Sequence, residues 1–184
     1  MPEKRNEQFI IKKSIQKYKN PWIEVVEDQI IRPDGKPGIF GIVKMMNGIS
    51  VLPLDEKDYV YLTEEFHYAI SKVHIETVSG GIDKNEKPIE AAKRELKEEL
   101  GIEAKEWIDL GLVNPFTTVV KSSARMFLAR KLKFKKDNQE ATENIKLVKI
   151  KLEKAVKMVM DSVITHGPSC VLILKANKYL KSIK

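Results

Sequence analysis

Residues 80–102 read GGIDKNEKPIEAAKRELKEELGI, which is the most informative stretch of the chain. Two glycines precede a segment with helical periodicity that ends at Gly101. At about 100° per residue, the carboxylates of Glu95, Glu98 and Glu99 fall on one face of that helix. An adjacent apolar stripe can bury against a sheet; it consists of Ile89, Ala92, Leu96 and Leu100. The stretch therefore predicts a glycine loop followed by an amphipathic helix.

The three carboxylates indicate a metal site. Without a counter-charge they repel one another, and a hard divalent cation removes that cost. The stretch contains no Cys or His, so all available ligands are oxygens, and Mg²⁺ or Mn²⁺ fits better than Zn²⁺. Mg²⁺ usually completes its coordination shell with waters and substrate phosphates. The helix therefore predicts chemistry on a diphosphate.

The stretch resembles the Nudix box, the signature of the Nudix hydrolase family. That pattern is Gly, five residues, Glu, seven residues, then Arg-Glu-apolar-x-Glu-Glu-x-Gly-apolar. Every fixed position is matched, by Gly80, Glu86, Arg94, Glu95, Leu96, Glu98, Glu99, Gly101 and Ile102. The alternative is a solvated helix laced by pairs such as Glu90–Arg94. The glycines and Glu86, all in register with the helix, argue against that alternative.

The whole chain fits one globular domain with a small appendage, since it has 184 residues, of which 42% are hydrophobic. No apolar run reaches the length of a membrane span, and the N-terminus lacks the apolar core of a signal peptide. The single cysteine, Cys170, lies in an apolar run and excludes a disulfide framework. We therefore expect a cytoplasmic protein that does not contact a membrane.

The formal charge is +7, which raises the question of nucleic acid binding. The lysines are spread along the chain and are not interleaved with stacking aromatic residues. This distribution favours solvated lysine faces and argues against a nucleic acid partner.

Alternation and turn signals divide the chain into strands and helices. We expect strands at 9–18, 22–31, 39–46, 49–54, 59–66, 73–78, 107–113, 124–132 and 145–150. We expect helices from Pro88 to the glycine at 101, at 152–160 and at 168–183. The pattern indicates a mostly antiparallel or mixed sheet flanked by helices, an α/β (α+β) fold.

Motifs outside the box are similar to the ADP-ribose pyrophosphatase branch of the Nudix family. They are Asn20-Pro-Trp-Ile23, Pro33-Asp-Gly35, Val51-Leu-Pro-Leu-Asp55, Glu76 before the glycines, and Leu110-Gly-Leu-Val-Asn-Pro-Phe116. The resemblance implies a Nudix α/β/α sandwich with a mixed sheet at 46–184. It also implies a small N-terminal antiparallel β-appendage at 1–45 that forms a homodimer.

The resemblance implies Mg²⁺- or Mn²⁺-dependent hydrolysis of a nucleoside diphosphate sugar such as ADP-ribose, giving a nucleoside monophosphate and a sugar phosphate. It implies metal ligands at Gly80, Glu95, Glu98 and Glu99. It implies substrate contacts at Glu76, His67 and Trp22. Structural roles within the motif fall to Gly81, Glu86, Arg94 and Gly101.

Two departures leave the preferred base and sugar open. The chain has His67-Tyr68 where the branch usually has Arg-Tyr, and Thr77-Val78-Ser79 where it usually has Leu-Pro-Ala. Glu86 fits either an outer metal or water ligand or a helix N-terminal charge favoured by the dipole. No role is assigned to His74 or His166.

The branch usually takes its general base from a loop glutamate after the box, which here is Glu143 or Glu140. Glu143 is slightly favoured because it adjoins the strand that follows, and Glu95 is the next candidate. The alternative functions are a GDP-mannose, other nucleoside diphosphate sugar or dinucleotide pyrophosphatase, an RNA end-processing enzyme, and a non-catalytic nucleotide-binding Nudix module.

Overall fold

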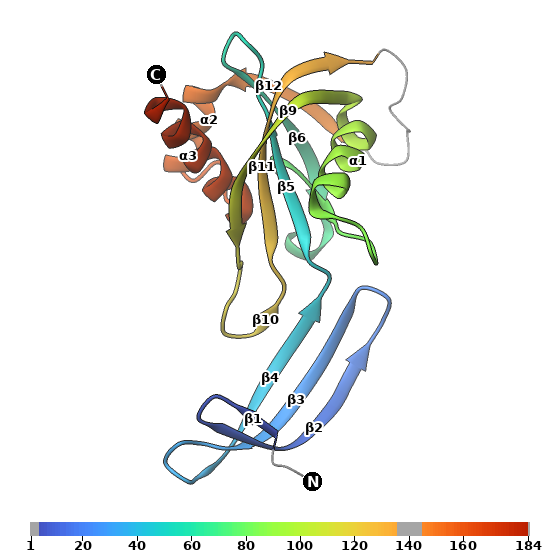
Figure 1. The fold of residues 1–184 in the computed structure, drawn as a ribbon, viewed down its shortest axis with the longest axis vertical. Coiled ribbons are helices and arrows are strands. Elements are labelled where there is room, and N and C mark those ends of the chain that lie inside the picture. Colours follow the sequence, from blue (N-terminus) through green and yellow to red (C-terminus); the bar gives the residue numbers. More distant parts are fainter. Residues whose placement is uncertain (1–3, 136–144, 184) are drawn as a thin grey trace. The chain divides into compact units, whose positions relative to one another are not determined.

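The computed structural model describes residues 4–135 and 145–183, which form two compact units (Figure 1). The smaller unit consists of Met1–Met46 and Asn114–Ser122, and the larger of Asn47–Val113 and Ser123–Lys184. The smaller unit therefore includes a segment from the middle of the chain as well as the N-terminal residues. Within residues 4–135 and 145–183, no helix combines the length and apolar character needed to span a bilayer.

The smaller unit is built on one sheet with the strand order β1-β2-β3-β4-β10. Its strands are β1 (Lys4–Asn6), β2 (Phe9–Lys19), β3 (Ile23–Ile31), β4 (Pro37–Met45) and β10 (Val120–Lys121). The first four strands pair antiparallel, while β10 pairs parallel with β4. The turn between β3 and β4 uses Gly35 at a φ of 77°, which glycine adopts without strain. The sequence did not predict β1 or β10, because strands of two or three residues are too short to show alternation.

The larger unit contains two sheets that an isolated bridge between Leu54 and Val60 connects. The first has the order β8-β5-β11-β9, with β5 (Gly48–Pro53), β8 (Val78–Gly81), β9 (Ile102–Val113) and β11 (Ala124–Phe134). The second has the order β12-β6-β7, with β6 (Tyr59–His67), β7 (Lys72–Glu76) and β12 (Lys146–Lys151). Strand β11 runs parallel to β5 and antiparallel to β9, so the predicted mixed sheet is confirmed.

Helices cover both faces of the larger unit's main sheet (Figure 1). They are α1 (Pro88–Leu100), α2 (Leu152–Met160) and α3 (Gly167–Ser182), and a short 3₁₀ turn, η1 (Tyr68–Ile70), joins β6 to β7. Strand β5 shows why both faces need cover: Val51 packs in the α1-side core and Leu52 in the α2–α3 side core, both fully buried. The α/β/α prediction is confirmed.

One predicted strand is wrong. The segment 73–78 is two strands, because β7 pairs with β6 while β8 pairs with β5. Thr77 lies between them, and its backbone N–H donates to the Ser169 hydroxyl. The chain therefore passes from one sheet to the other immediately before β8, and the two glycines lie at the end of that strand.

Candidate functional site

The predicted helix and its glycine end are present. Pro88 lies in the first turn of α1, where its missing N–H is not needed. Gly101 ends the helix at a φ of 62°, and its N–H donates to the carbonyls of Leu96 and Lys97. Ala92 and Leu96 are fully buried, so the charged face of α1 is directed away from that core.

Gly80 and Glu95 are in close contact across the loop and the helix. A Cβ placed on Gly80 would overlap Cδ and Oε1 of Glu95 and would lie 2.6 Å from its Cγ. The Glu95 side chain is 15% exposed and fills the space that a side chain at position 80 would need. Glycine is therefore required at position 80 because the Glu95 carboxylate approaches the backbone closely there.

Arg94 is the centre of this site. Its Nε and Nη2 donate to the two carboxylate oxygens of Glu86, both at 3.1 Å. Its Nη1 donates to Glu95 at 2.7 Å and to Glu98 at 3.1 Å, and Nη2 also donates to the Gly81 carbonyl at 3.0 Å. One guanidinium therefore connects the loop, the helix and the end of β8.

The charges of this cluster stabilise one another. The hydrogen bond from Arg94, followed by the backbone N–H of Asp83, lowers the pKa of Glu86. The hydrogen bonds to Glu86 and Glu95 raise the pKa of Arg94. Glu86 is thus a bidentate hydrogen-bond partner of Arg94. The sequence had left its role open between an outer metal or water ligand and a helix N-terminal charge.

The donor atoms around the loop suit a hard divalent cation in kind, since all are oxygens. No group of three His, Cys, Asp or Glu side chains converges as a metal site anywhere in residues 4–135 and 145–183. Glu95 and Glu98 instead converge on one nitrogen of Arg94, and Glu98 is 55% exposed. The donors beside Gly80 therefore match a divalent ion in chemical type, and such an ion would need water or ligand oxygens to complete its shell.

A second polar centre lies at Glu76, which is buried at the end of β7. His67 Nε2, from the end of β6, pairs with one carboxylate oxygen. His166 Nδ1, before α3, lies 2.9 Å from the other. His74 stacks edge-on against His67 with ring centroids 5.9 Å apart, so all three histidines of the sequence gather here.

A chain of hydroxyl groups extends this centre to the start of β8. The Ser169 hydroxyl lies 2.8 Å from His166 Nδ1 and 3.0 Å from the Thr77 hydroxyl, and it accepts a hydrogen bond from the Thr77 N–H. Thr77 in turn lies 2.6 Å from the Ser50 hydroxyl. Every polar side chain buried in the described residues belongs to this network; they are Ser50, Thr63, Glu76, Thr77 and Ser169. The network ties β5, β7 and α3 to the junction before the glycine loop.

The network is not a hydrolytic triad, although it contains serine, histidine and glutamate. Ser169 and Glu76 contact the same ring nitrogen of His166, whereas a triad needs one partner on each nitrogen. Ser169 is also fully buried, so no substrate carbonyl can reach its hydroxyl. These hydrogen bonds hold the backbone at Thr77 in place and do not activate a nucleophile.

Opposing effects set the protonation of Glu76. Burial alone raises its pKa, while the hydrogen bond from His166 and the charges of His166, His67 and His74 lower it, with a net lowering. Glu76 is therefore an ionised carboxylate at neutral pH, and both of its oxygens face histidines.

The remaining predicted residues lie elsewhere or outside the described residues. Trp22 belongs to the smaller unit, between β2 and β3, and is 71% exposed. Glu140 and Glu143 lie outside the described residues. Glu99 is half-buried on α1. Thr77 and Ser169 were not predicted as site residues; the signal for each in the sequence is a small polar residue bordering an apolar run.

Two family models match this chain. The NUDIX domain matches residues 44–156, and the nucleoside diphosphate sugar hydrolase N-terminal domain matches residues 12–43. Together they span most of both units.

Individual proteins of similar sequence and structure are more distant. ADP-ribose pyrophosphatase of Bacillus subtilis (strain 168) is 25% identical over 139 residues, which cover 74% of this chain and 75% of that protein. Methanol dehydrogenase activator of Bacillus methanolicus is 22% identical over 156 residues, covering 82% and 83%. A crystal structure of an ADP compounds hydrolase has the same fold, with a TM-score of 0.82, 19% identity and coverage of 94% of both chains.

We expect Gly80→Ala to destabilise the larger unit by about 1–3 kcal/mol, because the new methyl group forces Glu95 away from the loop. Urea denaturation measures this change in the free energy of unfolding. Gly167→Ala is the matched control, since a Cβ there has no heavy atom within 4 Å. Equal stability of Gly80→Ala and wild type would contradict the packing argument.

We expect Glu76→Gln to lower the free energy of unfolding by about 1.5–3 kcal/mol at pH 7, since it removes the charge that two histidines face. Because the folded-state pKa of Glu76 lies below its ordinary value of 4.5, the charge stabilises the fold above about pH 4.5. That stabilisation is lost as the pH falls through the folded-state pKa. Denaturation from pH 7 to pH 3 should therefore show the two proteins converging at acidic pH, and a constant difference would refute the assignment.

Proposed function

Since the chain belongs to the NUDIX family of hydrolases, we propose that it hydrolyses the diphosphate linkage of a nucleoside diphosphate sugar such as ADP-ribose. The products are a nucleoside monophosphate and a sugar phosphate. The match of residues 12–43 to the nucleoside diphosphate sugar hydrolase N-terminal domain supports this substrate class, as does the ADP-ribose pyrophosphatase relative.

The contact between Gly80 and Glu95 beside Arg94 is the observation that carries this proposal. It holds a carboxylate against backbone at the mouth of a glycine loop, with Glu98 one turn further along the same helix face. Such a set of oxygens suits a cation that is itself bound to phosphate oxygens.

Nudix hydrolases generally use divalent metal ions, and we propose Mg²⁺, or Mn²⁺, held by Glu95, Glu98, Glu99 and the Gly80 backbone. When bound, the ion neutralises diphosphate charge and acidifies water. Arg94 orients Glu95 and Glu98 toward one another, and Glu86 orients Arg94 through its two hydrogen bonds. Gly101 fixes the end of the helix.

A carboxylate must accept the proton of the attacking water. We propose Glu143 or Glu140 for this role, both of which precede β12 in the sequence and lie outside the described residues, with Glu95 as the next candidate. Substrate contacts are proposed for Trp22 and for the exposed edge of His67, which is 36% exposed. Glu76 then acts through His67 by holding its ring.

We propose a cytoplasmic homodimer in which residues 1–45 associate and residues 46–184 carry the Nudix site. The smaller unit is a single sheet that leaves large apolar side chains uncovered. Ile39 is 67% exposed and Met45 is 48% exposed, and both point to the same face of β4. A second copy would bury this face.

The function is tested with ADP-ribose, GDP-mannose, NADH, dinucleoside polyphosphates and 5′-triphosphate RNA, each with Mg²⁺. Release of AMP and ribose phosphate from ADP-ribose is the expected result. Preference for GDP-mannose or a dinucleotide would keep the pyrophosphatase activity and change the proposed substrate. Preference for RNA would replace the proposed function with RNA end processing. Binding without hydrolysis of any compound would indicate a non-catalytic module.

We expect Glu98→Gln and Glu99→Gln each to lower kcat by about 10²-fold or more, and a chelator to abolish activity, because each removes a charge that faces the metal. Initial rates with the best substrate of the panel measure this effect. Glu90→Gln is the matched control, because Glu90 lies on the same helix, where its carboxylate pairs with Lys93. Near-normal turnover of both variants would remove the metal assignment.

We expect light scattering to give twice the chain mass of 21.1 kDa at micromolar concentration. Ile39→Asp should shift the mass toward that of one chain, because it places a charge on the buried face. Lys36→Ser, in the exposed turn before β4, serves as the control. A wild-type monomer with full activity would exclude the dimer.

A further inference from the structure

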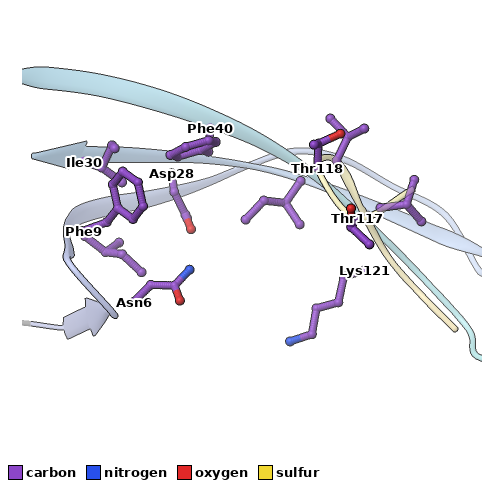
Figure 2. A pocket seen from close by; sticks show the side chains of 12 residues that line it. Asn6, Phe9, Asp28, Ile30, Phe40, Thr117, Thr118 and Lys121 are labelled. Carbon is purple, nitrogen blue, oxygen red and sulfur yellow. The ribbon is translucent and has the colours of Figure 1, made fainter. Parts of the chain in front are cut away.

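The smaller unit contains a pocket of about 340 Å³ that the proposed reaction does not use (Figure 2). Residues of the smaller unit line it entirely, from β1 to β4 on one side and from 117–121 on the other. This volume lies in the range of small-molecule sites, which are mostly apolar with a few placed polar groups. The pocket therefore has the size and character of a ligand site.

Asp28 is a half-buried acidic residue on the face of β3 that also carries Glu24, Val26 and Ile30. Its neighbours on that face, Val26 and Ile30, are buried at 7% and 4% exposure. Its Oδ1 is buried and has no hydrogen-bond partner among the described residues. A carboxylate oxygen that is removed from water without a donor costs free energy, so the site calls for a donor from a bound molecule.

The other acids of β3 show that this is specific to Asp28. Glu24 pairs with Lys44 at 2.7 Å, and Glu27 pairs with Lys17 at 3.1 Å. Glu24 and Glu27 are half-buried like Asp28, and each has a lysine partner, whereas no lysine pairs with Asp28 among the described residues.

Aromatic side chains form the wall beside this carboxylate. Phe40 stands opposite Asp28 in the ladder of β3 and β4, and Phe9 packs edge-on against Phe40 with centroids 5.4 Å apart. Asn6 points into the same space as Asp28, and Lys121 lies across the pocket (Figure 2). A flat apolar ring would contact the phenylalanines while its edge meets Asn6 and Asp28.

The hydrogen-bonding groups of Asp28 and Asn6 match the edge of one kind of nucleobase. A carboxylate only accepts hydrogen bonds, so two adjacent N–H donors suit it best. Guanine has two such donors, N1–H and N2–H, next to an O6 acceptor that the Asn6 amide can serve. Adenine places an acceptor beside its amino group and does not match. The Lys121 ammonium suits a phosphate attached to the ring.

We propose that this pocket binds a guanine nucleotide, with Asp28 accepting from N1 and N2, Asn6 donating to O6, and Lys121 contacting the phosphate. It is a binding site separate from the hydrolytic one in its residues, and it does not depend on the proposed reaction.

The test is calorimetric titration of the full-length protein with GMP, guanosine, IMP and AMP in the presence of a chelator. GMP should bind at least tenfold more tightly than AMP, and IMP, which lacks the N2 amino group, should fall between them. Asp28→Asn should weaken the binding of GMP at least tenfold and reduce the ratio of the GMP affinity to the AMP affinity. Lys121→Gln should weaken GMP severalfold and leave guanosine unchanged.

Asp34→Asn is the control, because Asp34 lies in the exposed β3–β4 turn of the same unit. Asn6→Ala, on the edge strand, provides a second variant if Asp28→Asn fails to fold, and it should also weaken GMP. Absence of GMP binding at 1 mM, or equal binding by wild type and Asp28→Asn, overturns the proposal. A lower mass of Asp28→Asn by light scattering, without GMP binding by wild type, assigns the pocket to a second copy of the chain and equally overturns it.

Discussion

The hydrogen bonds of Arg94 are the constraint on which the proposed hydrolytic site depends. The guanidinium holds Glu86 from the loop, Glu95 and Glu98 from the helix, and the carbonyl of Gly81 from β8. These groups come from three successive elements, and each hydrogen bond is charge-assisted or made to backbone. The N–H groups of the guanidinium point in fixed directions, so they fix the positions of these acceptors relative to one another. A lysine ammonium has no such fixed geometry. The packing of Glu95 against Gly80 then follows from the same geometry.

The buried polar network supports the other end of the loop. Arg94 fixes Gly81 at the end of β8, and Thr77 is fixed before its start by Ser169 and Ser50. Strand β8 is thereby held at both ends, although it has only four residues. Because the hydroxyl groups of Ser50, Thr77 and Ser169 are all partnered, they specify one position for the strand without the cost of unpaired buried hydroxyls.

The sequence was sufficient for the local parts of this structure. Helix α1, its proline and its glycine end follow from spacing within one segment, and the family resemblance placed Gly80 and the carboxylates. The sequence was insufficient where contacts join distant segments. His67 and His166 meet at Glu76 across much of the chain, and nothing in either segment indicates its partner. The same holds for Asn114–Ser122, which joins the smaller unit through a two-residue strand.

Electrostatics separates the two polar centres and explains why we propose a metal at only one of them. At Glu76 one carboxylate faces three histidines, so its charge is satisfied within the protein. At Arg94 one guanidinium faces three carboxylates, those of Glu86, Glu95 and Glu98, and cannot neutralise them all. Glu86 takes two of its hydrogen bonds, which leaves Glu95 and Glu98 sharing a single nitrogen. The negative charge that Arg94 leaves unneutralised therefore lies on the helix face beside Gly80, which is where we propose that a cation and a diphosphate bind.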